Sequence, residues 1–114
     1  MITFELKSKH IHCKEASINP GHYPRMDGDP VEQIGWQVYG DFEPLGVPTV
    51  NLADYDEFPS PGCVFVKITP EYDGWLTSLI DAGLVEETGR ILPAGLFDRY
   101  ASECRVLKPE LLEV

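Results

Sequence analysis

The sequence predicts an α+β domain in which an antiparallel sheet of five or six strands carries one amphipathic helix, at about residues 70–83, on one face. Residues 72–84 place large apolar side chains at the i, i+3, i+4 and i+7 spacing of a helix face. Several short segments alternate apolar and polar residues, as half-buried strands do, and Pro, Gly, Asn and Asp clusters separate them. The length of 114 residues indicates a single domain, 1–114.

The strands are expected at 2–7, 9–18, 34–39, 49–52, 63–68 and 101–107. Asn19-Pro20-Gly21 is a strong turn signal and is predicted to end the second strand. The 63–68 run is the richest in β-branched residues, which favours a place at the centre of the sheet. The segment after the helix is expected to be an ordered loop, held to the core by Ile91, Leu92, Leu96 and Phe97.

The helix carries its own boundary signals. Thr69 is suited to the N-cap and Pro70 to the first helical position. Gly74 lies inside the predicted helix, where it costs about 1 kcal/mol relative to Ala. Gly83 is placed to take the left-handed conformation that ends a helix, so that Leu84 packs back onto the last turn.

The charge balance is strongly acidic. Nine Lys and Arg face 19 Asp and Glu, for a formal net charge of −10. Because phosphate groups recruit basic residues, this balance argues against direct binding to nucleic acid or to an anionic membrane. It permits docking to a basic protein surface, including one that normally holds nucleic acid. The alternative is that the charge only keeps the protein in solution.

Three cysteines, Cys13, Cys63 and Cys104, are widely spaced and odd in number, which predicts reduced, mostly buried thiols. The N-terminal segment lacks the features of a signal peptide, and no apolar run approaches the ~20 residues that span a bilayer. We therefore expect a cytoplasmic protein without a membrane association.

The order of short motifs over residues 34–106 resembles a known family. The order begins with a strand that carries Thr49-Val50-Asn51-Leu52, then a Pro- and Asp-rich loop and an apolar strand. A helix that ends in Ala82-Gly83-Leu84-Val85 follows, and then Thr88-Gly89-Arg90 and Pro93-Ala94-Gly95. This order is similar to that of small acidic proteins of unknown function carried on plasmids, integrative elements and phages. The resemblance implies a mobile-element origin and a role among anti-defence functions, such as inhibition of a CRISPR nuclease complex. It implies no catalytic residue.

Motifs for catalysis or for a cofactor are weak, and we expect a non-enzymatic protein without a cofactor. The chain contains neither a GxxxxGK[ST] phosphate loop nor a GxGxxG motif. His10, His12 and His22 could together hold a metal ion, since alternate strand residues share a face. The absence of a clear fourth ligand favours solvated histidines, and a small-ligand or metal-binding domain is the alternative hypothesis.

Acidic residues gather in three predicted connections and form the candidate binding surface. If these connections share one sheet edge, they make a negative patch with aromatic anchors, which is typical of a protein interface. The alternative is that the rings lie in the core and the charges are scattered. The long loop at 20–33 is a further candidate contact region. The predicted protein-binding residues are Asp41, Glu43, Asp54, Tyr55, Asp56, Glu57, Phe58, Glu86 and Glu87.

Overall fold

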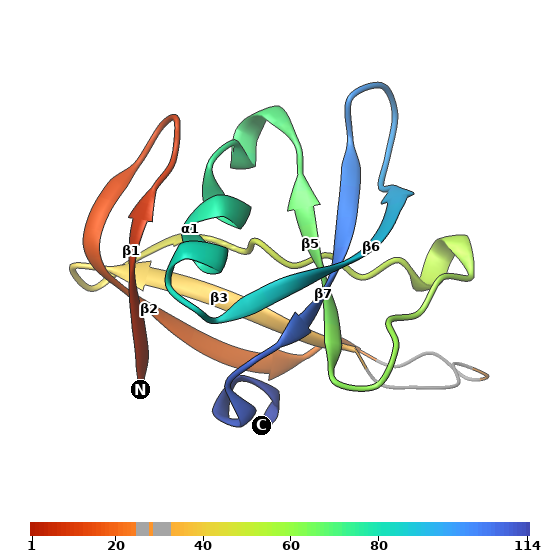
Figure 1. Ribbon diagram of the computed structural model, residues 1–114, viewed down its shortest axis with the longest axis horizontal. Coiled ribbons are helices and arrows are strands. Elements are labelled where there is room, and N and C mark those ends of the chain that lie inside the picture. The colour runs from red at the N-terminus through yellow and green to blue at the C-terminus, as the bar shows by residue number, and fades with distance from the viewer. Residues whose placement is uncertain (25–27, 29–32) are drawn as a thin grey trace.

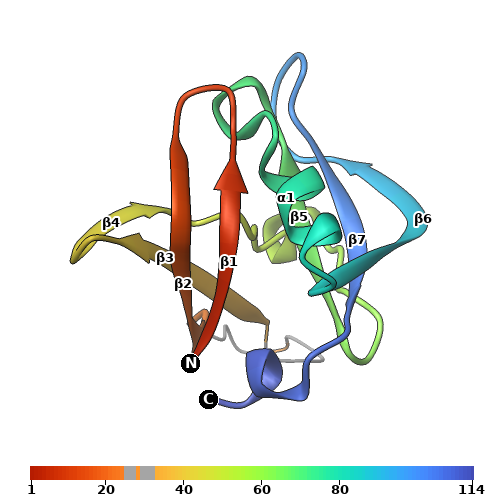
Figure 2. The same ribbon diagram turned by 60° about the vertical axis from the view of Figure 1, so that its left-hand side comes forward.

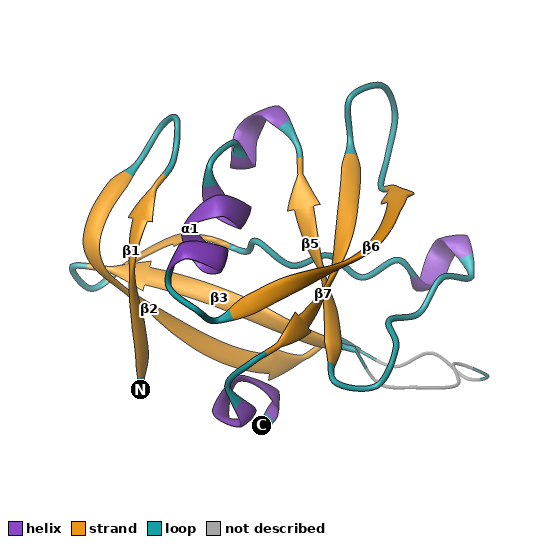
Figure 3. Cartoon of the chain, in the orientation of Figure 1, coloured by secondary structure: helices purple, strands orange, loops and turns teal. Residues whose placement is uncertain are grey.

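The computed structural model describes residues 1–24, 28 and 33–114, which form two antiparallel sheets and one α-helix (Figures 1 and 3). The first sheet has four strands in the order β1-β2-β3-β4, and the second has three in the order β5-β7-β6. The α+β class is confirmed, but the single sheet of five or six strands is wrong, because the strands divide between two sheets. The elements are β1 (Ile2–Lys7), β2 (His12–His22), β3 (Ile34–Gly40), β4 (Glu43–Gly46), η1 (Ala53–Tyr55), β5 (Cys63–Ile68), η2 (Pro70–Tyr72), α1 (Trp75–Asp81), β6 (Val85–Pro93), β7 (Tyr100–Val106) and η3 (Pro109–Leu112).

The second strand is longer than predicted. β2 continues through Asn19-Pro20-Gly21 to His22, so the predicted stop at this turn signal is wrong. The first residue of β1, Ile2, pairs with Ile18, and beyond Ile18 β2 pairs only with β3. The backbone N–H of Tyr23 donates to Gln33 O at 2.9 Å, so by alternation Pro20 N points away from β3. Proline is tolerated here because its missing N–H would face the side that β1, which starts opposite Ile18, does not reach.

The helix is shorter than predicted. Its first expected turn is the separate 3₁₀ element η2, and α1 begins only after Gly74, whose φ of 93° is left-handed. A Cβ on Gly74 would lie 2.7 Å from Lys7 O and 2.8 Å from Ser8 Cα. The chain therefore turns sharply where it passes the β1–β2 turn, and only glycine fits this contact. Thr69 makes no capping hydrogen bond.

The end of the helix follows the prediction. Gly83 has a φ of 72°, and Leu84 N–H donates to Leu79 O at 3.1 Å, which closes the last turn. On the apolar face Trp75, Leu79 and Leu84 are buried, whereas Ile80 remains partly exposed. The helix packs mainly against β1 and so covers one end of the space between the two sheets (Figures 1 and 2).

The strand order of the second sheet differs from the prediction. β7 is central, and β5, which was expected at the centre, lies at an edge. Residues 49–52 were expected to be a strand, but Thr49 forms one isolated bridge with Val66. The adjacent Val50 N–H donates to Phe65 O at 3.0 Å and protects the β5 edge. This segment therefore follows β5 without completing a regular strand.

The segment after α1 is the strand β6, not the expected loop, and a register shift between Glu87 and Ile91 interrupts it. Ile91, Leu96 and Phe97 are exposed, so their expected role in the core is wrong. Leu92 does pack against the outer cluster of the second sheet. The strand pattern was missed because the shift and Thr88-Gly89-Arg90 break the alternation.

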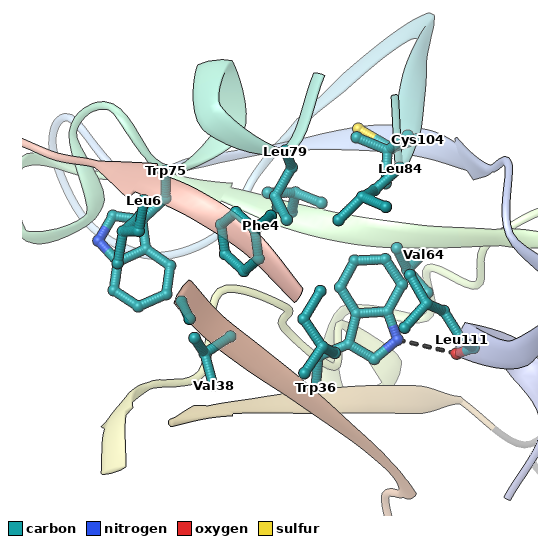
Figure 4. Packing of buried hydrophobic residues seen from close by; sticks show 14 residues of the cluster. Phe4, Leu6, Trp36, Val38, Val64, Trp75, Leu79, Leu84, Cys104 and Leu111 are labelled. Carbon is teal, nitrogen blue, oxygen red and sulfur yellow. Dashed lines mark hydrogen bonds between the residues drawn. The ribbon is translucent and has the colours of Figure 1, made fainter. Parts of the chain in front are cut away.

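The main core lies between the two sheets and beneath α1. Trp36 from β3 is fully buried, and its indole N–H donates to Leu111 O of η3 at 2.9 Å (Figure 4). This bond ties the C-terminal turn to the first sheet. A second, smaller cluster of Leu52, Phe65 and Ala101 lies on the outer face of the three-stranded sheet.

Candidate functional site: the acidic β3–β4 turn and its groove

The predicted acidic residues are not brought together into one patch. Asp41 and Glu43 lie at the turn between β3 and β4, whereas Asp54 and Asp56 lie at η1. Figure 1 shows this turn and η1 at opposite ends of the longest axis, whose extent is 39 Å. The predicted shared edge depended on a single sheet, and the division into two sheets separates the connections.

Several predicted residues already have partners within the protein. Glu57 forms an ion pair with Arg90 at 2.6 Å, and Glu86 forms one with Arg105. Glu87 Oε1 accepts a hydrogen bond from Ser102 Oγ at 2.9 Å. Phe58 is half-buried, and its carbonyl accepts a hydrogen bond from Arg90 Nη1 at 3.0 Å. These residues hold the second sheet and its loop together. In the other loop Asp54, Tyr55 and Asp56 are exposed.

The β3–β4 turn has an unusual conformation for its residues. Asp41 and Phe42 have φ values of 48° and 71°, as a two-residue hairpin turn of type I′ requires. Asn-Gly is the preferred pair in such turns, and a bulky residue at positive φ is an outlier. Phe42 is nevertheless fully exposed. Within the part of the chain that the structure describes, the fold itself supplies no packing contact that compensates the strained, exposed ring.

The carboxylates of this turn are unneutralised. Within the described part of the chain, neither Asp41 nor Glu43 forms an ion pair or a side-chain hydrogen bond. The turn closes tightly because Gly40 lacks a side chain. A Cβ there would lie 2.8 Å from both Cys13 Sγ and Leu45 Cδ1. The backbone thus fixes the position of an acidic, aromatic tip.

A groove of about 870 Å³ lies beside the turn. Ser17 and Asn19 of β2 and Tyr39 of β3 line it, and Ser17 pairs with Tyr39 across the two strands. Among the lining residues that the structure describes, Glu15 and Asp41 have the only charged side chains, and Met1 adds the N-terminal ammonium. We call this hollow the β2–β3 groove. Sequence analysis missed Glu15 and Tyr39, although Glu15, Ser17 and Asn19 alternate with buried residues of β2.

The structure does not bring the three histidines together. His10 lies in the β1–β2 turn, whereas His12 and His22 are the first and last residues of β2. Ten strand residues at about 3.3 Å each place His12 and His22 roughly 30 Å apart. The imidazole of His12 instead lies 2.8 Å from Glu5 and lowers the pKa of that carboxyl. Residues 1–24, 28 and 33–114 contain no group of three or more metal-ligating side chains.

The 20–33 segment is only partly a loop. Residues 20–22 belong to β2, and the Tyr23 hydroxyl lies 3.1 Å from both Thr49 O and Thr49 Oγ1. Its other predicted contact positions, at 25–27 and 29–32, lie outside the described residues. The three cysteines are free thiols, but only Cys104 is buried. Burial raises the pKa of Cys104 to about 11, so this thiol stays protonated at neutral pH.

One buried carboxylate was not predicted from the sequence. Glu103 of β7 is 4% exposed and accepts hydrogen bonds from Ser60 N and Ser60 Oγ at 3.0 and 3.1 Å. Thr88 Oγ1 and Arg90 Nη1 also donate to it, at 2.8 and 2.9 Å. Burial raises the pKa of Glu103, but these bonds outweigh burial and lower it overall. We call Glu57, Ser60, Thr88, Arg90 and Glu103 the Glu103 network.

Comparison with known proteins places no further constraint on the site. No protein-family model, curated protein or solved structure matches this chain. Within the described residues, no helix has the length and apolar character needed to cross a membrane.

Proposed function

We propose that this chain is a non-enzymatic binding protein that holds a basic segment of a partner protein in the β2–β3 groove. The observation that carries the proposal is Phe42, a fully exposed aromatic residue at positive φ on the rim of the groove. Asp41 and Glu15 line the same groove, and the one positive charge in its described lining is the N-terminal ammonium of Met1. An apolar anchor beside acidic side chains suits a partner that carries positive charge.

The Phe42 ring and the acidic charge act on different stages of binding. Burial of one Phe side chain is worth about 1.5–3 kcal/mol, so Phe42 would mainly slow dissociation. The free carboxylates and the net charge of −10 would attract a basic partner over distance and speed association. Such attraction weakens as salt shortens the Debye length, which is about 10 Å at 0.1 M.

The narrower proposal concerns the identity of the partner. A basic surface that normally holds nucleic acid would also accept these carboxylates, so the protein would act as a mimic of nucleic acid. A host defence effector such as a CRISPR nuclease complex is the partner that the motif resemblance suggests. The net charge of −10 supports the mimicry, and the resemblance supports the mobile-element setting.

Selection from a random peptide display library tests the proposal without a known partner. Peptides retained by the wild type should combine Lys or Arg with an apolar residue. Their association rates should fall as salt rises, and excess DNA should not bind the protein itself. The variant Asp41→Asn/Phe42→Ser/Glu43→Gln should lose these peptides.

A matched control exists at the other end of the molecule. Asp54-Tyr55-Asp56 repeats the acid–aromatic–acid pattern, is exposed, and is not part of the described groove lining. The variant Asp54→Asn/Tyr55→Ser/Asp56→Asn should retain the selected peptides. Loss of binding in the control variant alone, or selection of peptides without basic residues, would contradict the proposal.

A further inference from the structure

A small pocket of about 200 Å³ lies where the end of β5, η2 and the β6–β7 connection meet. Lys67, Thr69, Glu71 and Arg99 supply its polar lining, and Val50 and Ala94 supply apolar walls. Its residues are all different from those of the β2–β3 groove. We call it the Lys67–Arg99 pocket.

The pocket concentrates positive charge in an acidic protein, since two of its nine basic residues line it. The Lys67 ammonium lies 4.5 Å from the centre of the Tyr72 ring. No described carboxylate lies within ion-pair distance of Lys67. Arg99 and Glu71 neutralise each other, so the positive charge of Lys67 is the one in the pocket without a described carboxylate partner.

Arg99 already holds a carboxylate in the geometry of an anion site. Its two terminal nitrogens donate to the two oxygens of Glu71, at 3.1 and 2.5 Å. This forked arrangement is the one that guanidinium groups use for external carboxylates and phosphates. Glu71 belongs to the short element η2, and its side chain is half exposed. An external anion can therefore replace it without unfolding a strand.

Thr69 provides an unused polar group beside these charges. Its hydroxyl oxygen is buried and, among the described residues, is the one side-chain atom of this kind without a hydrogen-bond partner. The hydrogen bond from Arg99 lowers the pKa of Glu71 to about 2, and the nearby Thr69 hydroxyl makes the smallest contribution to this shift, without an aligned hydrogen bond. Buried polar atoms without partners are rare and call for an explanation. Thr69 immediately precedes η2 and lines the pocket with these charged groups.

We propose that the Lys67–Arg99 pocket binds an oxyanion, a carboxylate or a phosphate, and that Glu71 occupies the anion position when no ligand is bound. Arg99 would hold two oxygens of the ligand, Lys67 would neutralise it, and the Thr69 hydroxyl would donate to it. The apolar walls would accommodate a short hydrocarbon group. This proposal is independent of the function assigned to the groove.

Titration with inorganic phosphate, and in a second arm with acetate, tests the site at constant ionic strength. Amide NMR shifts at residues 67–72 and 94–99 give the dissociation constant. Glu71→Gln should tighten binding several-fold, because it removes the competing carboxylate. Lys67→Gln and Arg99→Gln should weaken binding several-fold. Binding of phosphate alone or acetate alone would identify which oxyanion the pocket prefers.

Glu86→Gln is the matched control, since it frees Arg105 from a similar exposed ion pair outside the pocket. It should leave phosphate and acetate affinity unchanged. If Arg99→Gln disturbs the hairpin, Glu71→Gln and Lys67→Gln still decide the question. Equal affinity in the wild type, Glu71→Gln and Lys67→Gln, or no binding of either anion, would overturn the proposal.

Discussion

The carboxylates of the Glu103 network and those of the β3–β4 turn have the same chemistry but opposite surroundings. Glu103 is buried and receives hydrogen bonds from a backbone N–H, two hydroxyls and Arg90. Asp41 and Glu43 are exposed, and no described residue neutralises them. The first group is needed to hold a loop against the second sheet, and the second is available to another molecule.

This contrast shows why net charge alone does not locate a binding surface. Glu57, Glu86 and Glu87 contribute to the charge of −10, yet each is engaged with a partner inside the protein. A buried carboxylate must be compensated, because desolvation without hydrogen bonds is costly. An exposed carboxylate has no such need. The informative acidic residues are therefore those that the fold leaves unpaired.

The largest effect is expected when Glu103 is replaced by Ala. Arg90 would lose a buried partner, and Ser60 and Thr88 would lose their acceptor. We expect a loss of about 2–3 kcal/mol in the free energy of unfolding, below the 3–5 kcal/mol typical of fully buried pairs because Arg90 is partly exposed. Urea unfolding measures the change.

Glu86→Ala serves as the control for this prediction. Its ion pair with Arg105 is exposed on both sides, so the loss should be about 0–1 kcal/mol. Equal losses in the two variants would mean that the buried carboxylate has no special role.

The sequence predicts the fold where one local pattern decides. Local sequence is enough to predict four features of the fold. These are β1 and β3 from their alternation, β5 from its apolar run, and the end of α1 from Gly83. The prediction fails where distant parts of the chain decide. Pro20 fits in β2 because β1, which starts opposite Ile18, does not pair with it. Gly74 breaks the helix where the chain passes Lys7.

Only part of the candidate site could be predicted from the sequence, since only part of it is formed by neighbouring residues. The acidic turn with Asp41, Phe42 and Glu43 is visible in the sequence. The groove beside it depends on how β2 and β3 pair, so Glu15 and Tyr39 have no local signal of a shared site. The partners of Glu57 and Glu86 depend on the division into two sheets, which periodicity does not specify.

A smaller effect on the free energy of unfolding is expected at low pH, and it again distinguishes the Glu103 network from the β3–β4 turn. The pKa of Glu103 lies below the ordinary value of 4.5 in the folded protein. A carboxyl with a lowered folded pKa stabilises the protein above its unfolded pKa, and this contribution is lost as pH falls through the folded pKa. Stability should therefore fall below about pH 4.5, and the fall should be smaller in Glu103→Gln.

Urea unfolding at a series of pH values measures this difference. The prediction fails if Glu103→Gln and the wild type lose stability in parallel between neutral pH and pH 3.

The smallest effect is expected at Phe42, and its sign should be opposite to that at Glu103. A left-handed conformation costs a non-glycine residue about 1–2 kcal/mol, whereas glycine adopts it freely but loses about 0.5–1 kcal/mol more through backbone entropy. Because the Phe42 ring is fully exposed, Phe42→Gly should raise the free energy of unfolding by about 0.5 kcal/mol. Phe42→Ala, which keeps the strain, should change stability by less than about 0.5 kcal/mol. Both variants should lose the basic peptides selected by the wild type, since both remove the apolar ring. A loss of stability above about 1 kcal/mol in Phe42→Ala would instead show that the ring packs within the protein and is not an anchor for a partner.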